Sequence, residues 1–143
     1  MKQHLLRFII ALFAISIWGG TSWGQNVIWS EDWSSATEGQ KPEVVNSMYT
    51  SKDSKSITKI YNENRSGGTA PELLIAKNSG SWTIKDIDIT GISGELTLSF
   101  KSNYGNYLVI KANETKIAEN PKEINDNQYE VTFTVDASSN KLT

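Results

Sequence analysis

Few side chains in this sequence are suited to covalent or acid–base chemistry. The 143 residues include no cysteine and a single histidine, His4. Thiolate metal sites, disulfides, cysteine nucleophiles and lipid attachment through cysteine are therefore excluded. A serine hydrolase needs a histidine base, and His4 lies in an N-terminal segment that we expect to be removed. The composition therefore favours a protein that is not an enzyme.

Asp86 and Asp88 come closest to a pair of catalytic carboxylates. A glycosidase holds two acids about 5–10 Å apart in a cleft, and two residues on one strand face can meet that distance. These two flank an expected bulge, however, with Ile87 and Ile89 buried on the opposite side. This arrangement is typical of a wet sheet edge, so we expect no catalysis there.

The segment Asn103-Tyr104-Gly105-Asn106-Tyr107 combines amides with aromatic rings. Sugar recognition uses an aromatic face against the C–H side of the ring and planar amides for its hydroxyls. Asn103, Tyr104 and Asn106 are therefore candidate ligand-binding residues. The alternative is a plain hairpin, with Gly105 or Asn106 at positive φ and Tyr107 in the core.

Three tryptophans are further candidate platforms for a ligand. Trp29 and Trp82 lie in strand patterns, which favours the core for both. Trp33 follows two acids at a strand end, so its ring either is exposed as a fourth ligand-binding residue or covers the end of the fold.

The first 24 residues have the layout of a secretory signal peptide. A basic start with Lys2 and Arg7 precedes the uncharged run from Phe8 to Trp18, and small residues precede a cleavage site after Gly24. The run is too short for a transmembrane helix, which needs about 20 apolar residues. We therefore expect residues 1–24 to be a signal peptide and residues 25–143 to be the exported domain, which is periplasmic, at the cell surface or extracellular.

Removal of the signal peptide changes the charge. Without Lys2 and Arg7, 12 of the 14 basic residues remain against 16 acidic ones, which gives a net charge of −4. No basic patch remains for nucleic acid or an anionic membrane surface, so neither is an expected partner.

The exported part has the period-two pattern of half-buried strands. The clearest strand is Tyr129–Asp136, with Tyr129, Val131, Phe133 and Val135 inward, and Leu96–Lys101 repeats the pattern with Leu96, Leu98 and Phe100. Further expected strands are residues 27–29, 57–61, 72–76, 82–85 and 107–112. The more continuous apolar run of 107–112 predicts a central strand covered on both faces. A change of parity predicts a bulge or bend near Asp86. The polar stretch from Glu38 to Lys55 is interpreted as a long excursion and not as a linker.

Short strands separated by turn residues predict an all-β fold, an antiparallel β-sandwich or jelly roll. Three segments also carry a family resemblance: Ile28-Trp29-Ser30-Glu31-Asp32-Trp33, Thr69-Ala70-Pro71-Glu72-Leu73-Leu74-Ile75 and Gly94-Glu95-Leu96-Thr97-Leu98-Ser99-Phe100-Lys101. In this order they resemble the jelly-roll, galactose-binding-like (carbohydrate-binding-module-like) domains of secreted Bacteroidetes proteins. The resemblance covers residues 27–143 and implies the fold and a link to glycan handling.

The resemblance has two further implications. Related jelly rolls place a structural Ca²⁺ near the first strand, which makes Glu31 and Asp32 candidate ligands, although adjacent side chains point to opposite faces of a strand. The alternative is a solvated strand end. Such domains also finish with a further strand that pairs near the first one, and here the sequence reaches a turn and the first residues of a new strand at Lys141-Leu142-Thr143. The domain is therefore expected to be incomplete at its C-terminus, without its closing strand.

Two classes of function fit these features. The first is a non-catalytic module of an exported bacterial protein that binds a glycan or another surface component. The second is a structural or anchoring β-sandwich of a surface or secreted protein, with no small ligand. The amide–aromatic segment favours the first, and the evenly distributed polar residues favour the second.

Overall fold

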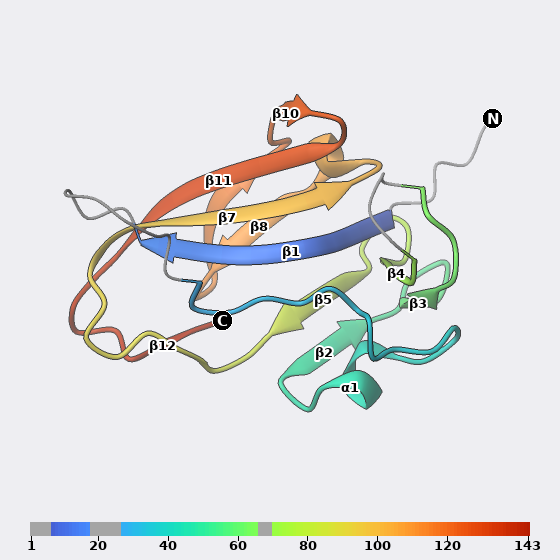
Figure 1. Ribbon diagram of the computed structural model, residues 1–143, viewed down its shortest axis with the longest axis horizontal. Helices are drawn as coiled ribbons and strands as arrows, with labels where there is room; N and C mark the ends of the chain where they lie inside the picture. Colours follow the sequence, from blue (N-terminus) through green and yellow to red (C-terminus); the bar gives the residue numbers. More distant parts are fainter. Residues whose placement is uncertain (1–6, 18–26, 66–69) are drawn as a thin grey trace.

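The computed structural model describes residues 7–17, 27–65 and 70–143, the first of these ranges by its backbone alone. The strands form antiparallel sheets in two layers with almost no helix, so the predicted all-β antiparallel sandwich is confirmed. Figure 1 shows β11, β7 and β1 side by side across the molecule, with β8 behind them. Neither of the two short helical segments in the described ranges, α1 (Pro42–Val45) and η1 (Gly105–Tyr107), is long enough to cross a membrane.

One layer is a six-stranded sheet in the order β10-β11-β7-β1-β4-β3. Its strands are β1 (Arg7–Ile17), β3 (Lys59–Tyr61), β4 (Glu72–Leu74), β7 (Gly94–Ser102), β10 (Glu123–Asn125) and β11 (Gln128–Val135). The opposite layer consists of three separate pairs, β2-β5, β6-β12 and β8-β9. These are built from β2 (Tyr49–Lys52), β5 (Ser81–Ile84), β6 (Ile87–Asp88), β8 (Val109–Ala112), β9 (Thr115–Glu119) and β12 (Lys141–Leu142).

The strongest sequence patterns gave the strands correctly. β7 and β11 pair along their whole length, from Gln128↔Lys101 to Val135↔Gly94. Their inward side chains are the predicted ones, because alternation places every second residue against the opposite layer. Those that are buried are Leu96, Leu98, Phe100, Tyr129, Val131 and Val135, with Phe133 partly buried.

The apolar segment that we expect to be a secretion leader forms the central strand β1. It is antiparallel to both neighbours and pairs with β7 at six residue positions and with β4 at two. A continuous apolar run is typical of a strand with neighbours on both sides. The expected cleavage site between Gly24 and Gln25 lies outside the described residues.

Three expectations about local structure need correction, and one is confirmed. Residues 27–29 contribute a single bridge at Val27 and no strand. The polar stretch from Glu38 to Lys55 contains α1 and β2. Pro42 suits the first position of α1, because a proline has no backbone N–H that would lack a hydrogen-bond partner there. β8 is not a covered central strand: it pairs with β9 alone among the described strands, and Val109 is 55% exposed. The bend near Asp86 is confirmed, with this residue at φ +59° between β5 and β6.

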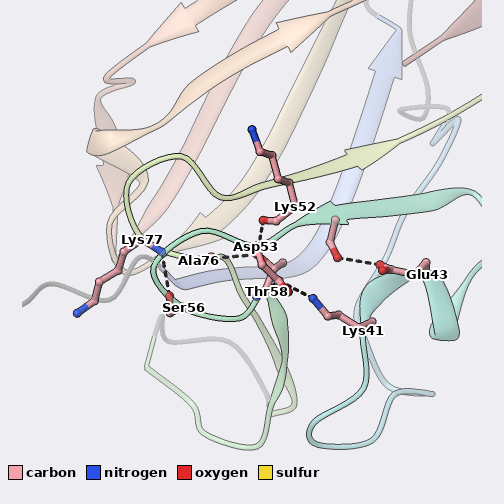
Figure 2. Close-up of polar contacts among 9 residues, drawn as sticks. Lys41, Glu43, Lys52, Asp53, Ser56, Thr58, Ala76 and Lys77 are labelled. Carbon is pink, nitrogen blue, oxygen red and sulfur yellow. Dashed lines mark hydrogen bonds and ion pairs between the residues drawn. The ribbon is translucent and has the colours of Figure 1, made fainter.

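A buried threonine connects the polar stretch to the end of β4. Thr58 is fully buried, and its hydroxyl donates a hydrogen bond to the Lys52 carbonyl (3.0 Å) and accepts one from the Ala76 amide (2.9 Å). Its own amide donates to Asp53 (2.8 Å), which also forms an ion pair with Lys41 (Figure 2). The Lys41 ammonium and the Thr58 amide together lower the pKa of the Asp53 carboxyl. This network could not be predicted from the sequence, because a single threonine carries no periodic pattern.

We expect Thr58→Val to lower the free energy of unfolding by about 1–3 kcal/mol, because valine keeps the shape but removes the hydrogen bond to the Lys52 carbonyl and the one from the amide of the buried Ala76. Urea denaturation followed by tryptophan fluorescence measures the change. Thr58→Ser is the matched control, since it keeps the hydroxyl and should cost less. An equal loss in both variants would show that the methyl group, and not the hydrogen bonds, matters.

Candidate functional site

The residues Asn103–Tyr107, here called the tyrosine loop, connect β7 to β8 and include η1. Tyr107 is 66% exposed, and its ring centroid lies 6.4 Å from that of Tyr104 with the planes tilted by 55°. Asn106 is exposed, and Asn103 and Tyr104 are half-buried. The loop therefore presents an aromatic ring and an amide to solvent, next to a second ring and a second amide.

The tyrosine loop has this shape because it packs on β11. Gly105 is buried against the Tyr129 ring, where a Cβ atom would lie 2.5 Å from the ring carbon Cε2. Tyr129 in turn stacks on Phe100 at 5.3 Å, which extends the contact into the core. The expected hairpin was wrong in detail: Gly105 and Asn106 are in a 3₁₀ turn, not at positive φ, and Tyr107 points to solvent.

Glu31 and Asp32 are engaged in hydrogen bonds within the protein. The two Glu31 carboxylate oxygens accept from the Trp33 amide (2.7 Å) and from the Tyr49 hydroxyl (2.5 Å). Asp32 accepts from the Ser34 amide (2.9 Å), and hydrogen bonds from Ser34 lower the pKa of its carboxyl. Burial, followed by the Glu31 carboxylate, raises the pKa of the Tyr49 hydroxyl. Within the described ranges no group of three or more histidine, cysteine, aspartate or glutamate side chains that could hold a metal ion occurs.

Trp33 is a core residue and offers no face to a ligand. Its side chain is fully buried, with ring centroids 5.5 Å from Tyr49 and 5.3 Å from Trp82. The backbone of Trp33 adopts φ +60°, and its ring belongs to a core cluster with Ile60 and Leu73. Of the two alternatives drawn from the sequence, the exposed ring is not observed.

Asp86 and Asp88 each contact a neighbouring residue at the surface. Asp86 forms an exposed ion pair with Lys141 (3.1 Å), and Asp88 accepts a hydrogen bond from the Thr90 amide (2.9 Å). That amide lowers the pKa of Asp88, whereas the general acid of a glycosidase needs a raised pKa. The two carboxylates therefore belong to a turn at the sheet edge.

An open groove of about 540 Å³ lies between β5 and β8. Its sides are formed by β5 and β8, and Tyr107, Thr143 and Glu114 also line it. The groove is lined largely by apolar side chains from both layers: Trp82, Ile84, Leu98, Leu108, Ile117 and Phe133.

The sequence did not reveal this groove, although one signal was present. Residues 107–112 carry apolar side chains on both faces, a pattern that predicts a central strand, yet β8 has one strand neighbour in the described structure. An apolar strand with one edge bordering a groove is therefore the feature that could have indicated it.

Comparison of the chain with protein-family models, with curated protein sequences and with solved structures finds no match.

Proposed function

We propose that the chain is a non-catalytic carbohydrate-binding module of an exported bacterial protein, with the tyrosine loop as its binding surface. The observation that carries the proposal is the exposed Tyr107 ring beside Asn106. The Tyr107 side chain is 66% exposed although its ring is largely apolar. Such exposure on a surface loop is typical of a recognition residue.

The chemistry of the loop fits a sugar ring. An aromatic face can pack against the apolar C–H side of a pyranose, and each asparagine amide supplies both donors and an acceptor for neighbouring hydroxyls. The loop is held against the buried Tyr129 through Gly105, so its backbone is ordered before a ligand arrives. The resemblance to galactose-binding-like domains supports the same class of ligand.

Export is part of this proposal and rests on the N-terminal sequence. A basic start, an apolar run and small residues before Gln25 are the three parts of a secretory leader. The same apolar run pairs as β1, so processing would remove a central strand and leave facing edges of β4 and β7 to be covered by another segment.

A structural or anchoring module is the second candidate function. The observation that favours it is that Glu31 is hydrogen-bonded within the protein and that the Trp33 ring is fully buried. Of the ligand-binding segments drawn from the sequence, the tyrosine loop is then the one that remains. A protein of this class would use its sheet edges and its groove for contacts with other polypeptide segments.

A glycan array probed with the chain and with Tyr107→Ala tests the proposal. We expect a polysaccharide to bind the chain and to bind Tyr107→Ala about tenfold more weakly, equivalent to about 1.4 kcal/mol. Val44→Ala is the matched control, since Val44 is equally exposed at 66% but lies on α1. An array without any binding, or an equal loss in the control, would favour the structural module.

A further inference from the structure

We propose that the space between β4 and β7, which β1 fills, is in the exported chain the binding site for an extended strand of a partner protein. This space is bounded by the facing backbone edges of the two strands and is here called the strand slot. The inference rests on the export part of the proposed function, since removal of the leader is what would free the slot. It does not depend on carbohydrate binding.

Both walls of the strand slot are held in place by strands other than β1. β7 pairs with β11 at eight residue positions, and β4 pairs with β3 at three. Leu98 and Phe100 of β7 and Leu73 and Leu74 of β4 are also buried. The two edges are therefore positioned by contacts that do not involve β1. A free strand edge of this kind is a template for pairing with another chain.

The leader is an imperfect strand for the slot. Four residues, numbers 10–13, lie between the paired positions Ile9 and Ala14 of β1. Their partners on β7, Lys101 and Ser99, are separated by Phe100 alone. Four residues against one interrupt the ladder between β1 and β7. A regular strand pairs without this interruption, so a partner strand would replace the leader with a gain in backbone hydrogen bonds.

The inward face of β7 defines the side chains that the partner strand needs. Leu96, Leu98, Phe100 and Ser102 are buried, whereas the residues between them are partly exposed. Residues directly opposite each other on antiparallel strands share a face of the sheet. A partner strand of about seven residues, paired from Ser102 to Leu96, therefore has its first, third, fifth and seventh side chains inward. These positions should be apolar, and those between them can be polar.

The leader already follows this rule where it pairs regularly with β7. Ile15 and Ile17 are the register partners of Leu98 and Leu96, and Ser16 lies between them. Isoleucine thus occurs at the positions of the inward face and serine at a position of the outward face. In strand addition, main-chain hydrogen bonds give affinity and alternate side chains give specificity, so the strand slot should select a partner by this alternation.

The test uses the full chain with a protease cleavage sequence inserted between residues 20 and 21. The folded chain is cut, unfolded in urea and refolded with about a tenfold excess of a fluorescent peptide, Phe-Ile-Val-Ala-Ile-Ser-Ile, with a lysine tail for solubility. This peptide joins the paired residues of β1 through one valine opposite Phe100. We expect about half or more of the refolded chains to carry the peptide in size-exclusion chromatography with fluorescence detection.

Two matched controls locate the bound peptide. A peptide of the same composition, Phe-Ile-Ala-Val-Ser-Ile-Ile, places alanine and serine opposite Phe100 and Leu98 and should bind at least about tenfold more weakly. The uncut chain keeps β1 attached and has the same other sheet edges, so its uptake of the first peptide should also be at least about tenfold lower. Equal uptake of both peptides, equal uptake by cut and uncut chain, or no uptake would overturn the partner strand.

The N-terminal residue of the chain recovered outside the cytoplasm tests the export part separately. A chain that begins at Gln25 supports processing. An intact leader together with peptide uptake would overturn the processing, and with it the role of the strand slot in the cell. Processing without peptide uptake would overturn the partner strand and leave export standing.

Discussion

Removal of residues 1–24 is expected to abolish cooperative unfolding of the remaining chain. β1 lies in the interior of the six-stranded sheet and pairs with β7 at six residue positions and with β4 at two. Without it, the backbone groups that bonded to β1 on both neighbours lose their partners, and two sheet edges open in the middle of the layer. Urea denaturation should change from one sigmoidal transition to a broad slope, and size-exclusion chromatography should show self-association.

A chain lacking residues 1–6 alone is the matched control, since it loses Lys2 but keeps all of β1, including Arg7. This control should unfold like the chain of 143 residues. If residues 25–143 instead unfold cooperatively at an unchanged midpoint, β1 contributes nothing to the folded domain, and the segment serves as a leader alone.

The second large effect is expected from Trp33→Ala, which should lower the free energy of unfolding by about 3–5 kcal/mol. The Trp33 ring is fully buried among Tyr49, Trp82 and their neighbours, so its loss leaves a cavity in the core. Alanine keeps the Cβ atom at φ +60°, so the backbone strain is unchanged and the difference reports on the ring. Thermal and urea denaturation measure it.

Trp33→Phe separates the contribution of the ring volume to stability from the contribution of the indole nitrogen. Among the described residues the buried indole Nε1 of Trp33 has no hydrogen-bond partner, so phenylalanine removes volume without breaking a hydrogen bond. It should cost less than alanine. Val44→Ala on the exposed face of α1 should change stability by under about 0.5 kcal/mol. A small effect of Trp33→Ala would contradict the burial of the ring.

The sequence predicted the fold best where a pattern repeats. The alternation in Leu96–Phe100 and Tyr129–Val135 gave both strands and their inward faces, because burial of one face demands every second residue to be apolar. The change of parity near Asp86 correctly predicted the bend between β5 and β6, because the inward face must shift by one residue there. β2 was missed, since its residues Tyr49–Lys52 include one buried side chain, Tyr49, and its pairing with β5 is what holds it extended.

The candidate site was predictable only in part. Residue types alone indicated the tyrosine loop through Asn103, Tyr104 and Asn106, whereas the most exposed ring of the loop belongs to Tyr107, which the sequence did not single out. They could not show that Trp33 is buried, because this depends on Tyr49 and Trp82, which are distant in the sequence. Likewise, the Glu31 carboxylate looked like a metal ligand until its hydrogen bond from Tyr49, 18 residues away, was located.

If the chain is exported as we propose, the position of β1 also has a kinetic consequence. A segment that has paired between β4 and β7 would not be accessible to an export machinery until that pairing opens. The rate of export of a folded precursor would then be set by the opening rate of the sheet, and not by the hydrophobicity of the leader alone. Substitutions in β4 or β7 that weaken this pairing would speed secretion while lowering the stability of the precursor.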